Sequence, residues 1–292
     1  MIPSLPRPTW LRGATAAYLA AFLIFLFLPL VIVAIFAFNN APYPAPPWRG
    51  FTLDWFLGSS STGRTGLFGD RDLLGSIWTS FVVAVWVTML SVAVGTANAF
   101  LIERTRFPGK QALSILMLAP LVIPGVILGI SILAFASQVA DLLDSAFGLD
   151  VDFLRPGLPL VVLGQFSYIA TIATLTISAR LRRFDRTLEE AALNLGASRA
   201  AVLRVIVLPY LRPALFGSGA IAFLMSFADF NTTLMLVGAD SPLTVMMYGR
   251  MREGATPVLN AVSLFLMVAS ALLAVTLIRG DSRKVKPAAE SS

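Results

Sequence analysis

The 292-residue sequence contains no cysteine and no histidine. The absence of cysteine excludes disulfides, thiolate metal sites and a cysteine nucleophile. The absence of histidine removes the usual general base of neutral pH and the commonest zinc ligand. Ordinary hydrolytic or metal chemistry is therefore not expected, and we predict a non-catalytic chain with no metal site and no cofactor of its own.

Charged residues are scarce as well. They make up 13% of the chain, hydrophobic residues make up 57%, and the mean hydropathy is +0.81. A typical soluble domain carries about 25% charged residues. A soluble fold of this size would lack the polar side chains needed to cover its surface. The composition therefore predicts an integral membrane protein.

Long apolar runs dominate the sequence, and a helix needs about 20 apolar residues to cross a membrane. Only the fifth run contains a charged residue, Asp229. The first run is too long for the core of a signal peptide, so we interpret it as an uncleaved anchor. Pro29, Pro120 and Pro124 are expected to kink their helices. The sequence predicts an all-α protein with six transmembrane helices at 15–38, 76–102, 111–137, 158–179, 213–231 and 258–278.

Lysine and arginine are distributed unequally between the two sides of these six spans. One side holds sixteen of them and the other side holds six. Because positive residues favour the cytoplasmic side, both termini are predicted to be cytoplasmic. The basic balance then reflects contact with anionic membrane lipid and not with nucleic acid. The basic side comprises the N-tail 1–14, the 103–110 loop, the 180–212 loop and the C-tail 279–292.

Glycine and proline mark two further features. The extracytoplasmic 39–75 segment is rich in both, and Gly63 and Gly66 suggest a phosphate-binding loop. The required Gly-Lys-Ser/Thr is missing, so we predict a solvated loop there. Gly125 and Gly129, four residues apart in the third span, can allow another helix to approach closely.

The 180–212 loop has strong local signals for two short helices. Thr187-x-x-Glu190 is a capping box that would start the first helix. Gly196 lies where that helix would end with a positive φ. Ser198 can cap a second helix, which Pro209 would close before the fifth span. We expect a near-right-angle bend between the two helices on the cytoplasmic face, with small exposed residues at Ala191, Ala192 and Ala197.

The same loop resembles a known motif. Glu190-Ala191-Ala192, then Gly196, then Ile206-x-Leu208-Pro209 is similar at every spacing to the EAA loop of bacterial ABC importer permeases. In that family the loop is a coupling helix that inserts into a cleft of an ATP-binding subunit. The resemblance implies a coupling role for Glu190, Ala191, Ala192, Gly196, Ala197, Ile206, Leu208 and Pro209.

The resemblance extends over nearly all the chain. Five further segments are similar to the second permease of spermidine/putrescine-type importers: residues 51–56, 76–81, 123–124, 226–229 and 256–261. Those permeases often carry two adjacent acids near Asp229, and Ala228 replaces the first of them here. This departure leaves other solutes open, namely ferric ion, thiamine, phosphonates, opines and amino-acid-like amines.

The resemblance implies a type I importer permease in a bacterial inner membrane. Such a chain would pair with a homologous permease, and an extracytoplasmic solute-binding protein would deliver the solute. Two ATP-binding subunits would dock on the cytoplasmic side and hold ATP and Mg. The implied function is ATP-driven import of a small cationic, polyamine-like amine.

Asp229 is the one charge inside a predicted span, and an ionisable group there suggests a functional role. With Ser226, Asn231 and Thr233 it could offer acceptor oxygens to a cationic amine. Alternatively, Asp229 could cap a helix, pair with Arg250 or Arg252, or meet water.

Two rival functions of the whole chain have less support in the sequence. A secondary transporter needs ion-coupling acids and repeated broken helices, and an integral membrane enzyme would need paired carboxylates within the spans, which this sequence lacks.

Overall fold

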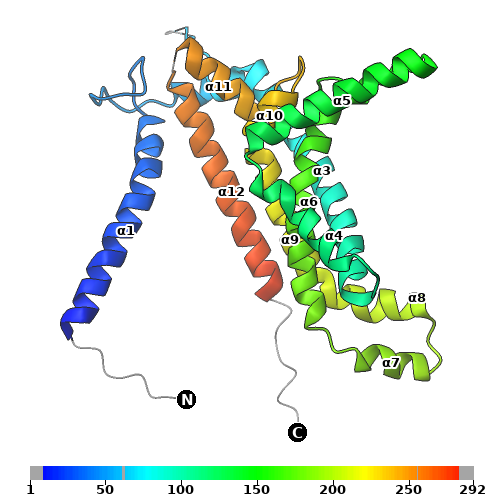
Figure 1. Ribbon diagram of the computed structural model, residues 1–292. Helices are drawn as coiled ribbons and strands as arrows, with labels where there is room; N and C mark the ends of the chain where they lie inside the picture. Colours follow the sequence, from blue (N-terminus) through cyan, green and yellow to red (C-terminus); the bar gives the residue numbers. More distant parts are fainter. Residues whose placement is uncertain (1–8, 61–62, 255, 283–292) are drawn as a thin grey trace. The chain divides into compact units, whose positions relative to one another are not determined.

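The computed structural model describes residues 9–60, 63–254 and 256–282, and helices make up most of them (Figure 1). Within these ranges the only strand-like pairings are two isolated bridges, Asn39 with Phe51 and Ser59 with Arg64. The predicted all-α class is therefore confirmed.

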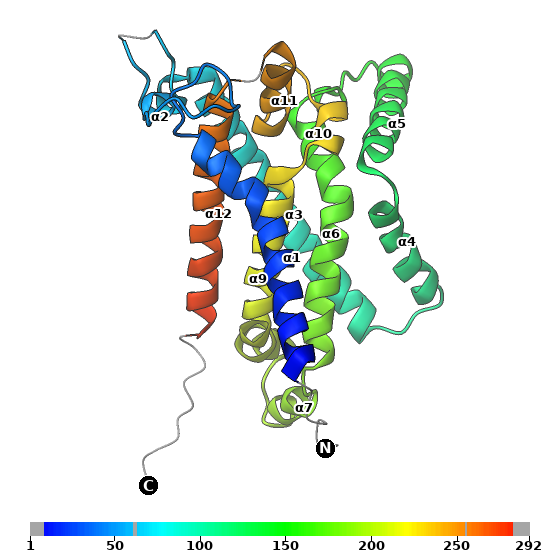
Figure 2. The same ribbon diagram turned by 90° about the vertical axis from the view of Figure 1, so that its left-hand side faces the viewer.

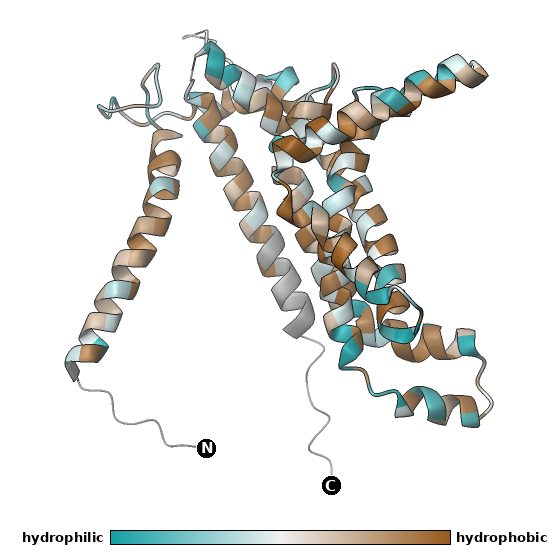
Figure 3. Ribbon diagram, in the orientation of Figure 1, coloured by the Kyte–Doolittle hydropathy of each residue, from teal (hydrophilic) through white to brown (hydrophobic). Residues whose placement is uncertain are grey.

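Five helices among the described residues are long and apolar enough to span a membrane. Figure 3 shows apolar residues along their lengths, with hydrophilic residues gathered near helix ends and in the short helix α7 (Thr187–Asn194). The chain is thus a multi-pass membrane protein. Four of them are α1 (Thr9–Phe36), α3 (Arg71–Arg104), α5 (Gly125–Phe147) and α6 (Leu158–Arg182). The fifth is the continuous helical run Arg199–Ala228, most of which is α9 (Leu208–Ala228).

The predicted third span is wrong as a single helix. It divides into α4 (Lys110–Val122) and α5, which run in different directions (Figures 1 and 2). Ile123 between them is extended, with φ −76° and ψ 129°. A residue before proline is disfavoured in the α conformation, and Pro124 has no N–H to donate, so the helix stops there. By contrast, α1 and α4 continue through Pro29 and Pro120.

The chain divides into two compact units. The first unit comprises the residues up to Arg71 together with Arg250–Leu272. It contains α1, α2 (Asp54–Leu57) and most of α12 (Val258–Ser282). Helix α12 coincides with the sixth predicted span. Its connecting segment is folded around Trp55, whose indole N–H donates to the Asn39 carbonyl at 2.8 Å. The expected solvated loop is therefore partly an ordered structure.

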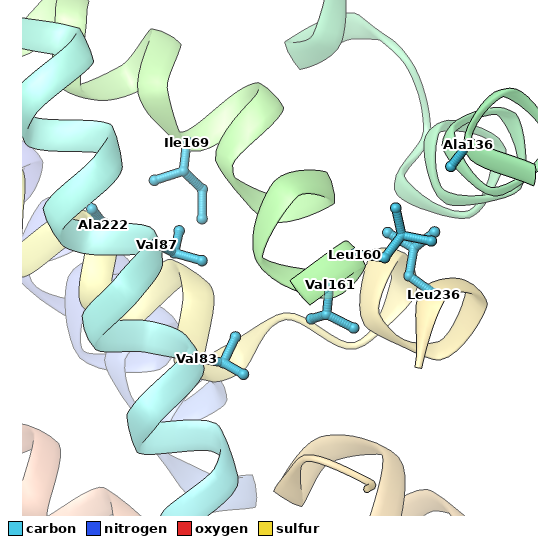
Figure 4. Packing of buried hydrophobic residues seen from close by; sticks show 8 residues of the cluster. All are labelled: Val83, Val87, Ala136, Leu160, Val161, Ile169, Ala222 and Leu236. Carbon is cyan, nitrogen blue, oxygen red and sulfur yellow. The ribbon is translucent and has the colours of Figure 1, made fainter. Parts of the chain in front are cut away.

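The second unit, Asp72–Gly249 with Leu273–Ser292, contains α3 to α10 and is centred on α6. Figure 4 shows its buried core, in which Ile169 of α6 faces Val87 of α3 and Ala222 of α9. Gly95 brings α3 close to α6, because a Cβ added there would lie 2.9 Å from the Cβ of Ala173. Packing of α3 and α9 on α6 fixes the helix ends that carry the polar residues described below.

A short helix, α10 (Asn231–Leu236), packs into a groove lined by glycines. A Cβ added at Gly129 would lie 2.8 Å from the Cβ of Met235, and one added at Gly125 would lie 3.0 Å from the Cβ of Asn231. The predicted close approach of another helix to this glycine pair is confirmed, and the helix concerned belongs to the same chain.

Candidate functional site

The connection between α6 and α9 begins with α7, which ends in a left-handed glycine. Gly196 has φ +87°. The Ala197 N–H donates to the Ala192 carbonyl at 3.0 Å, and the Gly196 N–H donates to the Leu193 carbonyl at 2.9 Å. These two bonds form a Schellman motif, which satisfies carbonyls that a helix end leaves unpaired. The predicted positive φ at Gly196 is confirmed.

A second helical segment follows directly. The Ser198 hydroxyl accepts from the Ala201 N–H at 3.2 Å and caps α8 (Arg199–Val202), as predicted. The predicted stop at Pro209 is wrong, because α8 continues through a π-helical turn, Leu203–Val207, into α9. Pro209 cannot donate a helical hydrogen bond, and the wider π turn just before it absorbs the change of register.

Two further local expectations are wrong. Figure 1 shows α7 and α8 running antiparallel, and the two helices contact each other, so the predicted right-angle bend is replaced by a hairpin. We call residues 187–202 the coupling hairpin, after the role that the sequence resemblance implies for them. The capping box is also replaced, because the Asp185 carboxylate accepts from the Thr187 N–H at 3.0 Å and from its hydroxyl at 2.8 Å. These bonds lower the pKa of Asp185.

The predicted coupling residues fall into two groups. Glu190, Ala191 and Gly196 are exposed on the hairpin. Ala192 and Ala197 are half-buried against the core beneath it, so their expected exposure is wrong. Ile206, Leu208 and Pro209 lie at the π turn and the start of α9, where they are also half-buried.

Sequence reasoning missed one residue of the hairpin. Leu195, at the end of α7, is 89% exposed, although leucine side chains outside the membrane are usually buried in the protein core. Its position beside Gly196 in a basic loop predicted to be cytoplasmic was the available signal. The hairpin therefore presents a protruding leucine together with Glu190 and Ala191.

The second predicted group surrounds a break in the helix. α9 ends at Ala228, Asp229 is extended with ψ 126°, and α10 begins two residues later. The predicted fifth span, 213–231, is therefore interrupted at Asp229 and is not helical to its end. The Asp229 Oδ2 accepts from the Thr233 N–H at 2.9 Å and from the Thr233 hydroxyl at 2.8 Å, and so caps α10.

A polar network extends from this break into α6. The Tyr168 hydroxyl donates to Asp229 Oδ1 at 3.1 Å, and Gln165 Nε2 donates to the Thr233 hydroxyl at 2.8 Å. The Ser226 hydroxyl donates to Gln165 Oε1. Gln165 is 1% exposed and Thr233 is fully buried. We call Gln165, Tyr168, Ser226, Asp229 and Thr233 the polar break.

The structure brings three of the four predicted pathway residues together. Asn231 is exposed and is not among the hydrogen-bonded members of the polar break. Arg250, one of the proposed partners of Asp229, instead makes two hydrogen bonds to Asp70, at 2.5 and 3.0 Å. Gln165 and Tyr168 were missed, although Gln165 is the one amide in the 158–179 span.

The chemistry of the polar break is that of a carboxylate held by uncharged donors. Asp229 is only half-buried, and two hydroxyls and one backbone N–H donate to its oxygens. A carboxylate has about four lone-pair sites, so one acceptor site is left for a further donor such as an ammonium group. No group of three or more acids that could hold a metal ion occurs in the described ranges.

Comparison with known proteins identifies the family. Residues 91–280 match the family described as "Binding-protein-dependent transport system inner membrane component". The spermidine/putrescine transport system permease protein PotC of Haemophilus influenzae is 28% identical over 252 residues, which cover 86% of this chain and 90% of PotC. The putrescine transport system permease protein PotI of Escherichia coli K12 is 28% identical, covering 83% of this chain and 82% of PotI.

Solved structures share the fold. A bacterial alginate ABC transporter in complex with an alginate pentasaccharide-bound periplasmic protein contains a chain with a TM-score of 0.75 and 19% identity. The match covers 95% of this chain and 96% of the other. A methionine ABC transporter in an inward-facing conformation matches with a TM-score of 0.53 over 74% of this chain.

Proposed function

The chain belongs to the family of inner membrane components of binding-protein-dependent transport systems, and it is therefore a permease subunit of an ABC importer; we propose that its cargo is a small cationic amine of the polyamine type. Two relatives named for spermidine and putrescine transport, each aligned over more than four fifths of both chains, support this cargo. The half-buried Asp229 carboxylate is the observation in the structure that favours a cation over an anion such as a phosphonate.

We place six spans in the membrane, with α4 and α5 sharing the third crossing and α12 making the sixth. Both termini and the coupling hairpin then face the cytoplasm. The lysine and arginine distribution supports this orientation. Single cysteines test it directly in a chain that has none. Asp150→Cys should react with a membrane-impermeant thiol reagent in intact cells, and Arg183→Cys should react only after permeabilisation. The opposite pattern would overturn the orientation.

The coupling hairpin is the proposed contact with an ATP-binding subunit. Its protruding Leu195, flanked by small and acidic residues, suits insertion into a cleft. In this proposal a homologous permease completes the membrane domain and a solute-binding protein delivers the amine outside. Two ATP-binding subunits hold ATP and Mg, and their closure opens the permease pair outward while hydrolysis returns it inward. Such a cycle is a two-state element biased from a distant site.

Uptake of radiolabelled putrescine by cells that express the whole transport system tests the cargo. We expect uptake that stops on ATP depletion and survives an uncoupler, which also distinguishes the importer from a secondary transporter. An excess of unlabelled spermidine should compete, whereas thiamine, a phosphonate, an opine or ferric ion should not. If putrescine is not taken up and one of these solutes is, the cargo proposal is wrong while the family assignment stands.

A further inference from the structure

The last turn of α3 contacts the coupling hairpin through charged groups. Arg104 Nη2 lies 2.5 Å from Glu189 Oε1 of α7. Arg182 Nε lies 2.8 Å from Glu103 Oε1, and Arg186 Nη2 donates to the Glu103 carbonyl at 2.9 Å. Two consecutive residues of one membrane helix thus hold both the end of α6 and the start of the hairpin.

The Arg104–Glu189 pair is sheltered from solvent. Its side chains are 17% and 25% exposed, and the Arg104 guanidinium lies 5.5 Å from the centre of the Phe184 ring, which is itself buried. The pair borders a hollow of about 450 Å³ whose other side is formed by Val202, Leu203 and Val207 of the following segment. A partly desolvated, hydrogen-bonded arginine–carboxylate pair has a fixed geometry that an exposed lysine pair lacks.

The covalent chain joins the hairpin to only two membrane helices, α6 before it and α9 after it. The contacts of Glu103 and Arg104 add α3 as a third. α3 also approaches α6 closely at Gly95, where an added Cβ would lie 2.9 Å from the Cβ of Ala173. A displacement of the hairpin by an ATP-binding subunit is then passed to three spans at once.

We propose that Glu103 and Arg104 are positioning residues that fasten α3 to the coupling hairpin, so that hairpin movement is transmitted to α3 during transport. This inference rests on the proposed coupling role of the hairpin. The residues named here touch neither the cargo nor ATP in this proposal. They act through Glu189, Arg182 and Arg186.

Charge reversal and its rescue test this proposal. The complete transporter, with its partner permease, ATP-binding subunits and solute-binding protein, is reconstituted in proteoliposomes. Putrescine uptake and ATP hydrolysis are measured in the same vesicles. Arg104→Glu and Glu189→Arg should each lower the number of amine molecules transported per ATP hydrolysed roughly fivefold. A fivefold change corresponds to a free energy of about 1 kcal/mol. The double variant Arg104→Glu/Glu189→Arg should recover most of the parent ratio.

Two controls separate fastening from general stability. Arg183→Glu makes the same charge change on an exposed residue one position from Arg182 and should leave the ratio unchanged. Glu189→Gln removes the charge with little change of shape, and serves if the reversals reduce assembly. A parent-like ratio in both single reversals or in Glu189→Gln, or a double variant that assembles without recovery, would overturn the proposal.

Gly196→Val separates this proposal from the one on which it rests. If Gly196→Val leaves ATP hydrolysis stimulated as in the parent, the hairpin is not the coupling element and the proposed function fails at that step. If Gly196→Val abolishes stimulation while the Arg104 variants behave as the parent, only the fastening role of α3 is wrong. Stimulation of ATP hydrolysis by the solute-binding protein serves as the readout if putrescine is not the cargo.

Discussion

The polar break and the coupling hairpin lie at opposite ends of α9 and satisfy their polar groups in different ways. At the polar break a single carboxylate is held by two hydroxyls and a backbone N–H, and an amide is buried behind them. At the hairpin, three arginines meet two glutamates in a partly exposed setting. The polar break therefore contains one charged side chain, whereas the contacts of the coupling hairpin combine positive and negative side chains.

Solvent explains the difference. Within a membrane, an ionised side chain is costly and water cannot replace a lost partner, so every donor needs a fixed acceptor. At the membrane surface water is available, and ion pairs can be broken at a modest cost. The polar break should therefore be intolerant of any lost acceptor. The hairpin should stay folded when a polar group is lost, whereas its role in transport should depend on its charges and on its backbone geometry.

The largest effect is expected from Asp229→Leu. This change removes the acceptor of three donors, two of them on the fully buried Thr233. A buried donor left without a partner costs about 1–3 kcal/mol, so the folded transporter should be largely lost. Asp229→Asn keeps an acceptor oxygen and should fold, but putrescine uptake should fall several-fold because the negative charge is gone.

Thermal unfolding of the purified complex and uptake at matched expression measure these two effects. Parent-like unfolding of Asp229→Leu would show that the polar break does not hold α10. Unchanged uptake with Asp229→Asn would remove Asp229 from the substrate pathway and leave it a purely structural role.

The second prediction concerns Gln165, which joins Ser226 to Thr233. Gln165→Leu preserves much of the volume but leaves the Ser226 hydroxyl without its acceptor. We expect a loss of about 1–3 kcal/mol in stability. The matched control is Thr176→Val on the same helix, because the Thr176 hydroxyl bonds only to the Ile172 carbonyl one turn earlier. Equal unfolding temperatures for the two variants would contradict a special role for the buried amide.

The same comparison explains how much the sequence could predict. Gly196 and Ser198 were identified correctly because helix capping depends on residues within one turn of each other. Gln165 and Tyr168 were not identified, because they lie 61 to 68 residues away from the groups they contact. Only packing of α6 against α9 and α10 brings them together.

The third span shows a different limit. Pro124 was recognised as a site of distortion, but the sequence did not distinguish a kink from a full break. In the structure α10 lies against Gly125 and Gly129 at the start of α5, a contact between segments about 100 residues apart that the local pattern does not contain. At the start of α7 the sequence offered two local acceptors, Thr187 and Asp185, and the structure uses the Asp185 carboxylate.

The third prediction tests backbone geometry at the hairpin. A left-handed conformation costs an L-residue roughly 1–2 kcal/mol, and nothing lies within 4 Å of a Cβ added at Gly196. Gly196→Val should therefore strain only the backbone, leaving the chain in the membrane but lowering substrate-stimulated ATP hydrolysis. Gly196→Asn is the control, because asparagine adopts this conformation more readily. Equal stimulation in both variants and the parent would argue against the Schellman turn as a coupling element.

The smallest effect is expected at Asp185, where an exposed carboxylate starts α7. Its pKa is lowered because it accepts from the Thr187 N–H and hydroxyl. A depressed folded-state pKa means that this contribution is complete above the ordinary value of about 4 and is lost as the pH falls through the lower folded value. The hydrogen-exchange rate of residues 187–190, corrected for intrinsic rates, should therefore be constant from neutral pH down to this pH range and rise below it.

Two variants and an uptake assay complete the test. Asp185→Asn keeps an acceptor without titrating, so the protection of residues 187–190 in this variant should not change with pH. Asp185→Ala should exchange faster at pH 7 while the protection of α9 stays that of the parent. Because water can take over the Thr187 donors, ATP-driven uptake should change little in either variant, unlike any change at Asp229. A loss of uptake in Asp185→Ala as large as that in Asp229→Leu would show that the hairpin is as intolerant of a lost acceptor as the polar break.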